Sequence, residues 1–70
     1  MTSTPSTATA AAELSAAAEA IGGYRRRVSE LVRPYLGTER DDLVSAIYEA
    51  ERSLQAAERT IQRALKLASS

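Results

Sequence analysis

Residues 14–35 read LSAAAEAIGGYRRRVSELVRPY, and every seventh position in this stretch is apolar: Leu14, Ile21, Val28 and Tyr35. The same spacing resumes after a turn-like break, at Ile47, Leu54, Ile61 and Ala68. A seven-residue apolar repeat is typical of an α-helix that packs along another helix. The sequence therefore predicts an all-α fold of two helices joined by a turn.

A second apolar series accompanies the first, at Ala10, Ala17, Tyr24 and Leu31 and again at Leu43, Ala50, Ala57 and Ala64. Together the two series predict the seam of an antiparallel, coiled-coil-like hairpin. We expect the large side chains of this seam to be Leu14, Ile21, Tyr24, Val28, Leu31, Leu43, Ile47, Leu54 and Ile61.

Composition and turn signals set the boundaries of the hairpin. Residues 1–7 are mostly Ser, Thr and Pro, so burial cannot offset the entropy of ordering them, and we expect a flexible tail. Pro34 disfavours a continuing helix, Gly37 supplies a left-handed exit, and Thr38 is a good N-cap residue. A single hairpin domain then covers residues 8–70, with helices at about 8–33 and 39–68 and a turn at about 34–38.

Gly22 and Gly23 lie inside the first predicted helix, where each glycine costs about 1 kcal/mol relative to alanine. The heptad phase crosses both glycines without a slip, so we expect a continuous helix, bent at most. A hinge at this pair is one alternative, and a neighbouring backbone that approaches the missing side chains is another.

The position of Pro34 leaves the register of the hairpin open. With a turn at 34–38, facing residue numbers add up to about 71, which places Ile21 against Ala50. If a longer first helix accommodates Pro34, the total rises to about 78 and Ile21 meets Ala57. Both registers set large side chains against small ones.

The composition excludes several classes of site. The 70 residues contain no Cys and no His, so disulfides and thiolate zinc sites are excluded, and we expect neither an enzyme nor a cofactor or metal. Nine basic and nine acidic side chains balance, so no net charge attracts nucleic acid. No stretch has the length and apolar character of a membrane span or a secretory signal, and we expect a cytoplasmic location.

Further apolar residues lie beside the predicted seam and widen the apolar stripe of each helix. A wide stripe is typical of helices that pack against more than one neighbour, as in a four-helix bundle. We therefore expect a non-catalytic interaction module, a small adaptor, assembly subunit or regulator, that forms a homodimer or docks on another helical protein. The candidate partner interface consists of Val32, Leu36, Val44, Tyr48 and Leu65.

Charged runs suggest an alternative function and a source of specificity. Arg25, Arg26 and Arg27, with Arg33 nearby, could contact nucleic acid phosphates, although three successive helical residues fan over most of a turn. A nucleic-acid-associated regulator is therefore the alternative, and a solvated or ion-paired flank is the simpler interpretation. Glu51 and Glu58 fall at predicted seam-edge positions, where charges commonly set the choice of partner.

Tyr35-Leu36-Gly37 lies at the predicted bend, where the small secreted WXG100-type hairpins carry Trp-x-Gly. With two helices joined at such a bend, the chain resembles that family, which implies a small secreted helical hairpin as a minor alternative. The chain departs from the family pattern at the tryptophan, in its shorter length, and in lacking the Tyr-x-x-x-Asp/Glu export signal after the second helix.

Overall fold

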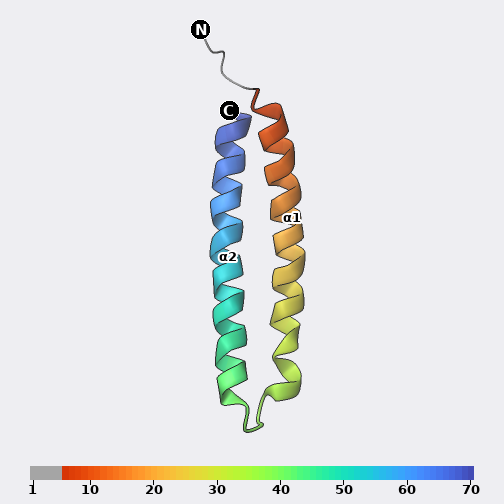
Figure 1. The fold of residues 1–70 in the computed structure, drawn as a ribbon, viewed down its shortest axis with the longest axis vertical. Helices are drawn as coiled ribbons and strands as arrows, with labels where there is room; N and C mark the ends of the chain where they lie inside the picture. Colours follow the sequence, from red (N-terminus) through yellow and green to blue (C-terminus); the bar gives the residue numbers. More distant parts are fainter. Residues whose placement is uncertain (1–5) are drawn as a thin grey trace.

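A computed structural model describes residues 6–70 of the chain. It contains helix α1 (Ala8–Leu31), the 3₁₀ turn η1 (Arg33–Tyr35) and helix α2 (Asp41–Ser69). The two long helices lie side by side and antiparallel, so that the start of α1 and the end of α2 meet at the same end (Figure 1). The all-helical hairpin predicted from the sequence is confirmed. Of the predicted tail, residues 1–5 lie outside the described residues.

Helix α1 is continuous through Gly22 and Gly23, so the continuous helix is confirmed and the hinge is wrong. Gly22 is buried where α1 faces Glu58 of α2. A Cβ atom on Gly22 would lie 3.6 Å from the Glu58 Oε2 atom, an ordinary van der Waals separation. The neighbour is thus a side chain, and no backbone atom of α2 comes close enough to require glycine.

Between the helices, buried and half-buried positions alternate at intervals of three and four residues. We name these positions the inner seam. In α1 and just after it they are Ala11, Leu14, Ala18, Ile21, Arg25, Val28 and Val32. In α2 they are Val44, Ile47, Glu51, Leu54, Glu58, Ile61, Leu65 and Ala68. A regular alternation of this kind is the packing geometry of a coiled coil.

The structure corrects part of the predicted seam, whose second series is half-buried at Ala17, Leu43, Ala57 and Ala64 and exposed at its other positions. The series through Leu14, Ile21 and Val28, and its continuation at Ile47, Leu54 and Ile61, lies inward as predicted. Tyr24 and Leu31 do not, because their exposed fractions are 58% and 55%. Leu43 is half-buried beside Val44 rather than at an inner-seam position.

The physical reason is that the first apolar series has two possible companions, one on each side of it. Either companion gives the same three-four spacing, so periodicity alone does not choose between them. In the structure the companion series is one residue later than predicted, at Ala11, Ala18, Arg25 and Val32 in the first arm. This choice buries Val32 and joins Arg25 to Glu58 by an ion pair with Nε and Oε2 3.0 Å apart.

The register is close to the longer of the two predicted alternatives, since Gly22 and Arg25 both face Glu58. Pro34 is accommodated at the start of η1, where its missing N–H costs no hydrogen bond. The Tyr35 N–H donates to the Val32 carbonyl at 3.0 Å and carries the chain one turn beyond α1.

The turn between the helices depends on Gly37 and Thr38. Gly37 has φ +76°, the left-handed conformation predicted for it. The Thr38 hydroxyl donates to the Tyr35 carbonyl at 2.6 Å and accepts from the Arg40 N–H at 3.2 Å. Thr38 therefore closes the turn, whereas Arg40 is the N-cap residue of α2, so the predicted N-cap is wrong by two positions.

Candidate interaction surface

The two helices of the hairpin are equivalent about an approximate two-fold axis perpendicular to their common plane. Arg25 and Glu58, which pair across the seam, are 33 positions apart. Adding the same 33 to any inner-seam position of the first arm gives an inner-seam position of α2. Because the axis is perpendicular to that plane, positions related by this shift lie on the same broad face of the hairpin.

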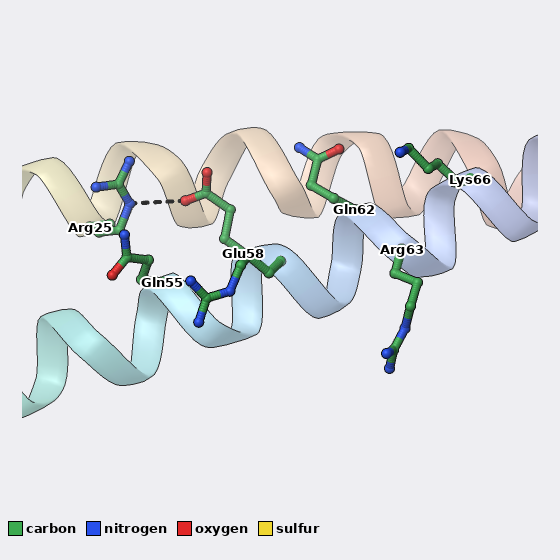
Figure 2. A pocket seen from close by; sticks show the side chains of 7 residues that line it. Arg25, Gln55, Glu58, Gln62, Arg63 and Lys66 are labelled. Carbon is green, nitrogen blue, oxygen red and sulfur yellow. Dashed lines mark hydrogen bonds and ion pairs between the residues drawn. The ribbon is translucent and has the colours of Figure 1, made fainter.

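One broad face is polar. A shallow groove on it is lined by Ser15, Glu19 and Gly22 of α1 together with Gln62 of α2. A second groove, of about 470 Å³, runs along α2 beside the Arg25–Glu58 pair, and Figure 2 shows Gln55, Gln62 and Lys66 around it. We name this side the polar face.

The opposite broad face is almost free of charge. It carries a second three-four repeat on each helix, next to the inner seam, and we name it the apolar face. Its α1 positions are Ala10, Glu13, Ala17, Ala20, Tyr24, Arg27 and Leu31. Its α2 positions are Leu43, Ala46, Ala50, Ser53, Ala57, Thr60, Ala64 and Leu67. Only Glu13 and Arg27 are charged, and most of these side chains are exposed.

The inner seam is incompletely covered within one hairpin. Among the hydrophobic side chains of the described residues, only Ala18, Val32 and Ile47 are buried. Leu14, Ile21, Val28, Leu54 and Ile61 are half-buried. Each of these five lies three or four residues from apolar-face positions on the same helix, so a layer placed on that face would cover them.

The predicted partner residues are not brought together. Val32 is 7% exposed and packs inside the hairpin, so its assignment to a partner interface is wrong. Val44 and Leu65 are half-buried in the inner seam. Leu36 in the turn and Tyr48 on α2 are exposed, but Tyr48 is equivalent to Ser15 and lies on the polar face.

The three consecutive arginines point to three different places. Arg25 pairs with Glu58, and Arg26 lies against Gly22. Arg27 is held over the Tyr24 ring, with its guanidinium carbon 5.2 Å from the ring centroid. Arg33 is exposed in η1. These arginines form no flat patch, and Glu51 and Glu58 occupy the inner seam rather than its predicted edge.

The acidic start of α2 holds a local ion pair. The Arg40 Nε donates to the Asp42 Oδ1 atom at 3.2 Å. This hydrogen bond, followed by one from the Leu43 backbone, holds the pKa of Asp42 below its usual value. Within residues 6–70, no group of three or more His, Cys, Asp or Glu side chains could hold a metal ion.

Sequence reasoning missed the apolar face because it assigned Tyr24, Leu31 and the alanines in phase with them to the core. The signal was present, since both three-four repeats can be read in the printed sequence. No described helix is long and apolar enough to cross a membrane. Comparisons with protein-family models, curated proteins and solved structures found no match for this chain.

Proposed function

We propose that this protein is a non-catalytic helix–helix interaction module that binds a helical partner through its apolar face. The observation that carries the proposal is the charge pattern of that face, on which only Glu13 and Arg27 break two rows of apolar and small polar side chains. An adaptor or assembly subunit fits this surface. Depletion of charge is the compositional mark of the core of a protein interface.

Energetics support the same assignment. Five of the large side chains that remain half-buried in the inner seam, Leu14, Ile21, Val28, Leu54 and Ile61, gain full burial only when a further layer covers them. Complete burial of a Leu or Ile side chain is worth about 1.5–3 kcal/mol relative to exposure. Tyr24 and Leu31 project from the face and are suited to anchor a partner, since aromatic residues are enriched among interface anchors.

The alternative of nucleic-acid binding through Arg25, Arg26 and Arg27 has weaker support. Phosphate binding needs free cations that face the same way. Arg25 is engaged by Glu58, and Arg26 and Arg27 point in different directions, so the three arginines do not form one cationic surface.

The proposal is tested with two glutamate substitutions at exposed positions of α1. Ala20→Glu places a charge within the apolar face, and Ser29→Glu places the same charge outside it. We expect Ala20→Glu to weaken association at least tenfold while Ser29→Glu leaves it unchanged. Association is measured by sedimentation of the pure protein and by cross-linking in the cells that express it. Circular dichroism checks that both variants stay helical.

Two results would contradict the proposed function. In one, association persists in both variants to the same extent. In the other, the wild-type chain is fully helical yet forms no complex, with itself or with any other protein, that depends on Ala20.

A further inference from the structure

The two charges on the apolar face are separated in a way that suggests their partners. Glu13 and Arg27 are 14 positions apart, about 21 Å along a helix, so they cannot pair within one molecule. In the described part of the chain the ion pairs are Arg25–Glu58 and Arg40–Asp42, which leaves Glu13 and Arg27 unpaired. Any partner that covers this face must meet one negative and one positive charge.

Ala20 is halfway between Glu13 and Arg27, and it also lies at the middle of α1 (Ala8–Leu31). When a second α1 lies antiparallel across the first and centred on it, Glu13 of each copy faces Arg27 of the other. A single two-fold symmetry operation thus forms two Glu13–Arg27 pairs, one at each end of the contact. We propose that the partner of the apolar face, and hence of the proposed function on which this inference rests, is a second copy of this chain in this antiparallel arrangement.

Side-chain sizes on α1 match the same register. Within one residue of the directly facing position, it sets Ala10 near Leu31 of the second copy and Ala17 near Tyr24 of the second copy. The two large exposed side chains of the face are thereby received by two alanines. Small residues let helices approach closely, and alternation of large and small side chains across facing positions gives ordered packing. Ala20 faces its own counterpart at the symmetry axis.

Helix α2 contributes a matching surface. Since Gly22 faces Glu58, the level of Ala20 falls on α2 near Thr60. Two copies of α2 then meet through small side chains around Ala57, Thr60 and Ala64, with Arg59 and Arg63 at the outer edge of this surface beside Thr60. Leu67, which is 72% exposed, falls opposite the Ala50–Ser53 stretch of the second copy. The resulting assembly is a four-helix bundle.

Charge reversal tests the register. Glu13→Arg sets two cations against each other at each contact, and Arg27→Glu sets two anions, so each variant alone dimerises about tenfold more weakly than wild type. An equimolar mixture of the two variants restores dimerisation, because every contact in the mixed dimer joins opposite charges. Glu19→Arg, a reversal on the polar face of the same helix, is the matched control and leaves dimerisation unchanged.

Single-cysteine variants test the geometry independently, and the chain has no native Cys to interfere. Ala20→Cys is expected to form disulfide-linked dimers under mild oxidation, because its counterpart lies across the axis within disulfide reach. Ala10→Cys alone is expected not to form them, whereas a mixture of Ala10→Cys and Leu31→Cys is expected to cross-link. Cross-linking of Ala10→Cys with itself and not of Ala20→Cys would overturn the antiparallel register.

The proposal and the proposed function fail in different ways. A wild-type mass equal to the 7.5 kDa chain at about 100 µM overturns the second copy as partner, while an Ala20-dependent complex with another protein would uphold the proposed function. If Glu13→Arg and Arg27→Glu each dimerise as strongly as wild type, the proposed register of the dimer is wrong. If the wild-type chain forms no complex that depends on Ala20, with itself or with another protein, both the second copy as partner and the proposed function are wrong.

Discussion

Gly22 occupies a helical position whose surroundings do not require glycine. Its added Cβ would make ordinary contacts with the Glu58 and Arg26 side chains, at 3.6 and 3.7 Å. Alanine also restricts the unfolded chain and has the higher helix propensity. We expect Gly22→Ala to raise the free energy of unfolding by about 0.5–1 kcal/mol, measured by urea denaturation followed by circular dichroism.

Gly37 provides the control for this substitution. It has nothing within 4 Å of an added Cβ, but its φ of +76° is costly for any side chain. Gly37→Ala should therefore lower the free energy of unfolding by about 1 kcal/mol. If the two substitutions had the same sign, the packing of Gly22 against Glu58 would be incorrect.

Asp42 makes the start of α2 sensitive to acid. Its pKa is lowered from 3.8, first by the hydrogen bond from Arg40 and then by that from the Leu43 backbone. The ionised carboxylate thus stabilises the folded state above the unfolded pKa of 3.8, and that stabilisation disappears as the pH falls through the lower folded pKa. NMR titration of the Asp42 carboxyl carbon should show the lowered pKa, and Arg40→Ala should move it back towards the usual value.

At the scale of elements, the Arg25–Glu58 pair joins α1 to α2 at a half-buried site. The exposed fractions of the two side chains are 30% and 26%, so solvent screens their attraction and reduces the energy of the pair. A double-mutant cycle with Arg25→Ala and Glu58→Ala should give a coupling energy of about 0.5–1 kcal/mol. No coupling would mean that apolar packing alone sets the register.

How far the elements could be predicted depended on the strength of local signals. Both helices followed from alanine content and seven-residue spacing, and Gly37 followed from its turn context. The companion series of the seam could not be predicted, because Arg25 and Glu58 are poorer core residues than Tyr24 and Ala57 by composition. Their mutual pairing, which the sequence does not display, allows both charged side chains to enter the inner seam.

The same reasoning explains why the candidate surface was misplaced in the sequence. Each helix carries two adjacent three-four repeats, the inner seam and the row on the apolar face, and on α1 the row that contains Tyr24 and Leu31 faces outward. In a single hairpin the apolar face contacts nothing, whereas a helix in a bundle packs against two neighbours at once. The α2 positions of the apolar face, from Leu43 to Leu67, include no charged residue, whereas those of α1 include two.

At the scale of the whole molecule, the interior of the hairpin is thin, and we expect its stability to depend on the proposed association. Only Ala18, Val32 and Ile47 are buried hydrophobic residues in the described chain, so the second layer that we propose on the apolar face would supply much of the remaining burial. Because association then favours the folded state by mass action, the melting temperature should rise with protein concentration, by about 3–6 °C for each tenfold increase.

The glutamate variants distinguish this origin of stability from the intrinsic stability of the hairpin. Ala20→Glu, which places a charge on the apolar face, should melt at a lower temperature than wild type, and its melting temperature should no longer depend on protein concentration. Ser29→Glu should keep the wild-type melting temperature and its concentration dependence, since Ser29 lies outside the apolar face. If wild type instead melts at one temperature over a hundredfold range of concentration, with full helicity throughout, the inner seam alone holds the hairpin together. The apolar face would then make no contribution to folding.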